Sequence, residues 1–148
     1  MENNTNTQVE NNFHLMTGIE LVQFFWDNVW NHPYDHNLID ELMVEDFIIT
    51  NAGKDIVGRE SFKEWLVGFR KVTNNFRLEN LEMFESKDGS RVVSRFLCSG
   101  NNNGMLGLDA DNKAFSFTGT AIWEIRGNKL AHNWVERSTY ELVQSLTN

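Results

Sequence analysis

Three polar residues near the C-terminus, His132, Glu136 and Ser138, have side chains suited to proton transfer and to binding an oxygen atom. An imidazole or a carboxyl group acts as a general acid or base when its surroundings bring its pKa close to neutral. A hydroxyl group can donate a hydrogen bond to a carbonyl oxygen. Because even numbers of positions separate the three residues, a regular β-strand would direct all three side chains to one face.

A long β-hairpin is predicted to position these side chains. Gly127-Asn128 lies between two runs rich in aromatic and β-branched residues, 115–126 and 129–140, as in a hairpin with a two-residue loop. Antiparallel pairing across this loop predicts one face made of Ile125 with Leu130, Trp123 with His132, Ala121 with Trp134, Gly119 with Glu136, Phe117 with Ser138, and Phe115 with Tyr140. This face is apolar except at the three polar residues.

The predicted face indicates a lined pocket. Gly119 and Ala121 are small, so they leave open volume beside Glu136 and Trp134. An ordinary core is the alternative, since aromatic side chains on one strand face are usually buried. Aromatic walls that carry a few polar groups are, however, typical of small-molecule sites.

Glu136 is the candidate catalytic acid/base, with His132 as the second candidate. An apolar wall would disfavour the charged carboxylate and raise the pKa of Glu136 toward the range useful for proton transfer. That wall would consist of Phe117, Trp123 and Trp134. In the alternative interpretation Glu136 forms a structural ion pair, with Arg137, Arg95 or His132 as its partner.

Composition limits the classes of partner. The 148 residues fit one domain, predicted over residues 14–148, after a polar tail at residues 1–13 that we expect to be disordered. A net charge of −8 repels phosphate backbones and anionic lipids, so nucleic acid and membranes are not expected partners. The single cysteine, Cys98, is compatible with a reducing compartment, and we expect a cytoplasmic location.

Periodicity predicts helices followed by strands. Thr17 and Glu20 form a capping box before a helix over 18–30, and two further helices are expected at about 37–43 and from Gly58 to about residue 73. Strands are predicted at 47–51, 54–57, 76–85 and 91–100, before a polar loop over 101–112. This order indicates an α+β domain whose helices pack on one side of a curved antiparallel sheet.

Other signals are weaker. His32 and His36 have the spacing of a helical metal pair, but Pro33 denies them a shared helical face, so no metal site is predicted. No dinucleotide-binding loop is present, and no cofactor is expected. Three helical aromatics, Trp26, Trp65 and Phe69, either line the mouth of the pocket or pack helices onto the sheet.

Three stretches together resemble a known family. They are NAGKDIVGRESFKEWLVGF at 51–69, SGNNNGMLGL at 99–108 and GNKLAHNWVERSTYELVQSL at 127–146. Their order and spacing resemble the SnoaL-like polyketide cyclases, within the nuclear transport factor 2-like (cystatin-like) superfamily that also contains ketosteroid isomerases. The resemblance implies a cone-shaped curved sheet and three N-terminal helices that enclose a pocket.

The resemblance also identifies positions where acid/base groups are absent. In these cyclases a buried Asp four residues after the Trp serves in an aldol ring closure that needs no metal. Ser138 occupies that place here, Asn102 occupies the place of the family's loop histidine, and Asn51 lies near that of the isomerase base. We therefore expect Glu136 to replace the missing Asp, while Ser138 and Asn51 hydrogen-bond a substrate oxygen.

Two functions follow as expectations. The first is a small-molecule-binding domain that acts as a cofactor-free cyclase, isomerase or hydratase on a hydrophobic carbonyl compound. The alternative is a non-catalytic ligand-binding or dimerisation module that has lost the family's catalytic Asp. In either case a homodimer is expected through the convex face of the hairpin, as this fold commonly uses. That predicted interface includes Thr118, Thr120, Ile122 and Val135.

Overall fold

The computed structural model of the protein describes residues 16–148, so the predicted tail at 1–13 lies outside the described residues. The helices are α2 (Gly18–Phe25), η1 (Trp26–Trp30), η2 (His36–Leu38), α3 (Ile39–Leu42), α4 (Arg59–Lys71), η3 (Met105–Gly107) and α5 (Thr139–Thr147). The strands are β1 (Met43–Asn51), β2 (Lys54–Val57), β3 (Thr73–Glu85), β4 (Arg91–Asn102), β5 (Ala114–Arg126) and β6 (Lys129–Arg137).

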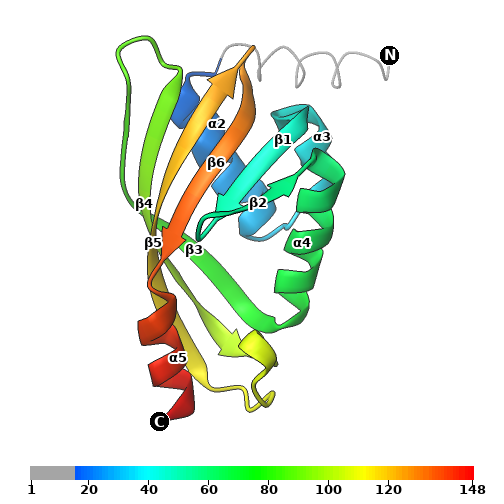
Figure 1. Cartoon of the computed structure of the whole chain (residues 1–148), viewed down its shortest axis with the longest axis vertical. Coiled ribbons are helices and arrows are strands. Elements are labelled where there is room, and N and C mark those ends of the chain that lie inside the picture. The colour runs from blue at the N-terminus through cyan, green and yellow to red at the C-terminus, as the bar shows by residue number, and fades with distance from the viewer. Residues whose placement is uncertain (1–15) are drawn as a thin grey trace.

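The strands form a single curved sheet in the order β2-β1-β6-β5-β4-β3. All neighbouring strands are antiparallel except β1 and β6, which are parallel. Figure 1 shows α2 and α4 on the same side of the sheet, with α5 at the opposite end of the molecule from the β5–β6 turn. The predicted α+β cone is therefore confirmed. None of the helices within 16–148 has the length and apolar character that a membrane crossing requires.

The first helix begins and ends at the predicted residues. Thr17 accepts a hydrogen bond from the backbone N–H of Glu20 at 3.2 Å, and the Glu20 carboxylate accepts one from the Thr17 backbone, which completes the capping box. The helix continues as η1 to Trp30. There Asn31 exchanges two hydrogen bonds with the backbone of Leu78, at 2.9 and 2.7 Å, and so fixes the helix end to β3.

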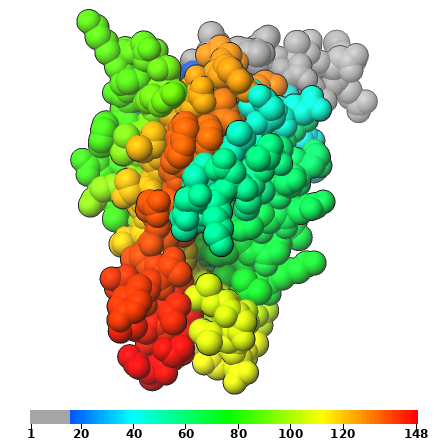
Figure 2. Space-filling view, in the orientation of Figure 1, coloured from blue at the N-terminus to red at the C-terminus, as the bar shows by residue number. Residues whose placement is uncertain are grey.

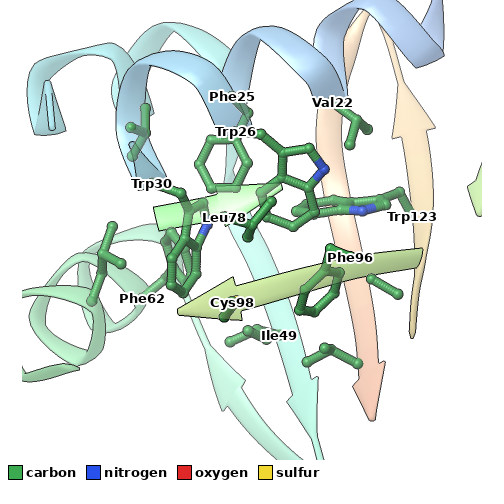
Figure 3. Close-up of a cluster of buried hydrophobic side chains, with 14 of the residues drawn as sticks. Val22, Phe25, Trp26, Trp30, Ile49, Phe62, Leu78, Phe96, Cys98 and Trp123 are labelled. Carbon is green, nitrogen blue, oxygen red and sulfur yellow. The ribbon is translucent and has the colours of Figure 1, made fainter. Parts of the chain in front are cut away.

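Aromatic rings fill the space between helix and sheet. Figure 3 shows Phe25, Trp26 and Trp30 projecting from the first helix toward Phe96 and Trp123 on the strands. Trp123 is fully buried, and its ring centroid lies 5.6 Å from that of Phe25 and 5.5 Å from that of Trp26. Trp123 therefore packs within the core and does not line either cavity described below.

The hairpin turn is as predicted, but the register beyond it is not. Gly127 and Asn128 both have positive φ, at 58° and 60°, as a type I′ turn requires, and Ile125 pairs with Leu130. Glu124 then pairs with His132, so Ala131 is an extra residue on β6. Such a β-bulge places two residues of one strand opposite one residue of the other.

The bulge reverses every side chain of β6 that follows it. A slip of one residue moves a strand's side chains to the opposite face. Asn133, Val135 and Arg137 consequently face the helices, with Asn133 at 4% and Val135 at 2% exposure. His132, Trp134 and Glu136 lie on the outer face instead, so the predicted pairing is wrong from His132 onward.

The hairpin also ends earlier than predicted. The predicted strand over 129–140 ends at Arg137, and α5 begins at Thr139. Leu142 and Leu146, four residues apart, are the buried residues of this helix. The turn from β6 into α5 directs the C-terminus along the end of the sheet, beside the loop between β4 and β5 (Figure 1).

Candidate functional site

An open cavity of about 320 Å³, which we call the aromatic pocket, lies at the end of the cone where α5 begins. Its walls come from the end of β1, from α4, from the loop around η3, from β5 and β6, and from α5. Figure 2 shows α5, in red, and the η3 loop, in yellow, side by side at this end of the molecule. The residues that define its chemistry are Asn51, Trp65, Phe69, Leu106, Phe117 and Arg137.

The aromatic walls are half-exposed rings on α4 and a buried ring on β5. Trp65 and Phe69, one helical turn apart, stack with ring centroids 5.9 Å apart and an angle of 20° between their planes. Phe117 faces them from the sheet. Three aromatic rings thus contribute to the lining, which suits an aromatic ligand.

Arg137 is the charged residue of the pocket. Its Nη1 donates a hydrogen bond to Oδ1 of Asn51 at 2.5 Å, and its guanidinium carbon lies 5.5 Å from the centroid of the Trp65 ring. Burial lowers the pKa of Arg137. Within residues 16–148 no carboxylate forms an ion pair with this guanidinium, although Arg59, Arg91, Arg95 and Arg126 each have such a partner.

The parallel pairing of β1 with β6 explains why Asn51 and Arg137 meet. Asn51 is the last residue of β1 and pairs with Val135 on β6. Two residues further along β6, Arg137 points to the same face as Val135. Its side chain therefore crosses the end of β1 and reaches the amide.

A narrow inner chamber of about 10 Å³ continues behind Arg137 toward the core. Trp26, Trp30, Cys98 and Asn133 line it together with Arg137. The indole N–H groups of both tryptophans and Oδ1 of Asn133 are buried, with no hydrogen-bond partner in the described part of the chain. A chamber of this size holds about one water molecule or one ligand oxygen.

Glu136 and His132 lie outside the pocket. Glu136 is exposed on the outer face of the sheet, opposite Thr120, so the apolar wall predicted around its carboxyl group is absent. His132 stacks on Trp134, with ring centroids 3.7 Å apart, and its Nε2 lies 2.8 Å from Oγ1 of Thr50. Partial burial lowers the pKa of His132.

The side chains of Ser138 and Asn102 form hydrogen bonds with backbone groups. The Ser138 hydroxyl accepts a hydrogen bond from the backbone N–H of Thr118 at 3.0 Å. The buried amide of Asn102 accepts from the backbone N–H groups of Gly104 and Met105, and it donates to the Asp109 carbonyl and the Asp111 carboxylate. Asn102 thus shapes the loop that brings Met105 and Leu106 to the pocket.

Of the predicted ligand-binding residues, the structure brings four together in the aromatic pocket. These are Asn51, Trp65, Phe69 and Phe117. Trp26 lines only the inner chamber, and Trp134 is on the outer face with His132. The sequence interpretation missed Arg137, because it placed this residue on the convex face.

One sequence signal could have located Arg137. Leu130 and Val135 are both apolar and are separated by an odd number of positions. A regular strand would place them on opposite faces, whereas a bulge between them lets both face the core. Burial of both residues bears this out, and Arg137 follows Val135 on the inner face.

Neither chamber offers a proton acceptor for neutral pH. No Asp, Glu or His lines either one within residues 16–148. Burial raises the pKa of the Cys98 thiol to about 12, so this group remains protonated. In the same residues no three His, Cys, Asp or Glu side chains converge as a metal site would need.

Comparison with known proteins places this geometry in context. Residues 20–146 match the family model of SnoaL-like polyketide cyclase. No curated protein sequence matches the chain.

Solved structures share the fold at low sequence identity. A protein assigned as a SnoaL-like polyketide cyclase from Jannaschia sp. CCS1 is 12% identical, with a TM-score of 0.80 over 88% of this chain and 91% of that one. A SnoaL-like polyketide cyclase from Agrobacterium tumefaciens is 13% identical, with a TM-score of 0.75 over 89% and 99%. A protein with a ketosteroid isomerase-like fold from Catenulispora acidiphila, solved with trimethylamine, is 16% identical, with a TM-score of 0.70 over 85% and 91%.

Proposed function

The chain belongs to the SnoaL-like polyketide cyclase family, and on that premise we propose that it binds a hydrophobic small molecule in the aromatic pocket without acting there as an acid/base catalyst. One observation carries this proposal. The pocket combines about 320 Å³ of open volume with aromatic walls, yet its described lining contains no Asp, Glu or His. The volume is within the usual range for small-molecule sites.

Ring geometry favours a planar ligand. The stacked rings of Trp65 and Phe69 on α4 line the pocket together with Phe117 on β5. An aromatic or conjugated molecule would contact all three rings and remove their exposed surface from water. The ligand class is therefore aromatic or polycyclic rather than sugar-like.

A cyclase, isomerase or hydratase acting on a hydrophobic carbonyl compound is the second candidate. Arg137 favours it, because a guanidinium at the pocket wall can donate hydrogen bonds to an oxygen on which negative charge develops. Proton transfer would then depend on water or on the substrate itself, since Glu136 and His132 lie on the outer face. A non-catalytic binding module needs no proton donor or acceptor, so we prefer this function to the enzymatic one.

Tryptophan fluorescence tests the binding proposal. We expect aromatic and steroid-like ligands, with 2-acetylnaphthalene as the first probe, to change the emission in a saturable manner. Leu106→Asp should weaken this binding, because Leu106 lines the pocket and is 55% exposed, which makes the change tolerable for folding. The control is Tyr140→Asp, at an exposed residue outside the pocket lining. Absence of saturable binding by every member of the panel would overturn the proposal.

The outer face of the sheet is proposed to pair two copies of the chain. Ile122 is 43% exposed there and pairs with Trp134 on β6, while Val135, part of the predicted interface, is buried on the inner face. Ile122→Glu should shift the sedimentation coefficient from that of a dimer to that of a monomer. Val57→Glu, at another exposed apolar residue, is the control. A monomeric unaltered protein would contradict this pairing.

A further inference from the structure

The surroundings of Arg137 define the polar part of the ligand. Arg91, Arg95 and Arg126 lie on the surface and pair with carboxylates, and the partly buried Arg59 pairs with Asp40. Arg137 is also partly buried but has no such pair within residues 16–148. A charge removed from water without a counter-ion is unfavourable unless another group compensates for it. The amide of Asn51, the ring of Trp65 and the electrostatic attraction of Glu136 compensate only in part, because burial still lowers the pKa of Arg137.

The guanidinium has unused hydrogen-bonding capacity. It carries five N–H donors in a planar fork, and the described contacts include a single hydrogen bond, to Asn51. Its side chain lines both the aromatic pocket and the inner chamber, so the remaining donors are at the junction of the two cavities. A carboxylate is the group that matches such a fork with two parallel hydrogen bonds.

The aromatic and cationic features are adjacent. Trp65 stacks with Phe69 and lies 5.5 Å from the Arg137 guanidinium. A planar molecule against these rings would therefore present a substituent directly to Arg137. Among the described lining residues, none is acidic and could compete with that substituent.

We infer that the ligand of the aromatic pocket is an aromatic carboxylate, held by Arg137 through its carboxylate and by Trp65 and Phe69 through its ring. This inference rests on the proposed function and specifies the ligand class. The protein as a whole carries −8 and repels anions at long range, so attraction of an anion to the pocket depends on Arg137, the charged residue of the described lining. The unpaired indole N–H of Trp30 in the inner chamber offers a further donor beyond Arg137.

Two probes of matched shape test the inference by titration calorimetry. The first is 2-naphthoate, which is ionised at pH 7, and the second is its neutral isostere 2-naphthamide. We expect the unaltered protein to bind naphthoate about tenfold to a hundredfold more tightly, the range for a hydrogen bond to a charged group. Arg137→Met should abolish that preference, because Met retains the apolar stem but cannot donate hydrogen bonds to a carboxylate.

Arg95→Met is the matched control, since Arg95 lies on the outer face in an ion pair with Glu82. It should leave the preference unchanged. Equal binding of the two probes by the unaltered protein would overturn the inference and leave the proposed function intact. Failure of both probes would instead count against the binding function itself. The comparison in the unaltered protein does not depend on the folding of any variant.

Discussion

The side-chain oxygen of Asn51 accepts a hydrogen bond from Nη1 of Arg137, across the parallel strands β1 and β6. The amide holds the guanidinium at the pocket without neutralising it. An aspartate at the same place would form an ion pair with Arg137 and remove the net positive charge from the cavity. Because residue 51 is an amide and not a carboxylate, the pocket retains the positive charge that would select an anion.

Asn51→Asp tests this relationship. We expect 2-naphthoate affinity to fall about tenfold, a loss of about 1.4 kcal/mol of binding free energy, because the new carboxylate competes for the guanidinium. Affinity for 2-naphthamide should change little, and Asn103→Asp is the control, with the same change of charge at an exposed residue. Calorimetry measures both affinities. Unchanged naphthoate binding would show that Asn51 does not govern the charge of the pocket.

The register of β6 predicts that substitutions at two adjacent residues differ greatly in their effect on the free energy of unfolding. Val135→Asp places a charge on the buried inner face, so the free energy of unfolding should fall by about 3 kcal/mol or more. Glu136→Gln changes an exposed side chain and should alter it by no more than about 0.5 kcal/mol. Urea denaturation provides both values. If Val135→Asp were tolerated and Glu136→Gln strongly destabilising, the results would instead support the hairpin without a bulge.

Ligand binding is expected to be independent of pH between 5 and 8 for the neutral probe 2-naphthamide. The two titratable groups in the described lining are Arg137 and Cys98. Guanidinium groups remain protonated in proteins despite burial, and burial raises the pKa of the Cys98 thiol to about 12. Neither group changes charge in this range. A change in affinity of more than about threefold in calorimetry would indicate a titrating group in the pocket.

Asn102 is predicted to stabilise the loop rather than to contact the ligand. Asn102→Ala removes the acceptor of the Gly104 and Met105 N–H groups and should destabilise the protein by about 2–3 kcal/mol. Thermal unfolding measures this loss. At temperatures where the variant is folded, hydrogen exchange should be faster at residues 103–108 than in the unaltered protein. Normal stability combined with lost ligand binding would instead assign Asn102 to the site.

Local patterns predicted much of this molecule correctly. The capping residues Thr17 and Glu20 determined the start of the first helix, and Gly127 with Asn128 determined the hairpin turn, because each signal acts through neighbouring backbone groups. The family resemblance is confirmed by the match over residues 20–146. Trp65, Phe69 and Phe117 were named as candidate ligand-binding residues from the aromatic pattern and Asn51 from the resemblance, and all four line the aromatic pocket.

Regular alternation along β6 predicted the wrong inner face, because the bulge in this strand accompanies a long-range pairing. β6 pairs with β1 as well as with β5, and the β1 register also shifts between Met43 and Ile48, opposite Leu130 and His132. Alternation along a single strand does not report such a contact. Because of this reversal, the charged group of the pocket is Arg137 and not the predicted Glu136. The pocket therefore has the features of an anion-binding site, where the sequence had indicated an acid/base site.

A crystal structure with 2-naphthoate tests the central claim most directly. We predict the naphthalene ring against Trp65 and Phe69, with the carboxylate within hydrogen-bonding distance of the Arg137 guanidinium and Glu136 in solvent on the other face of the sheet. Naphthoate bound elsewhere, or Glu136 directed into the pocket with Arg137 outside it, would contradict the account.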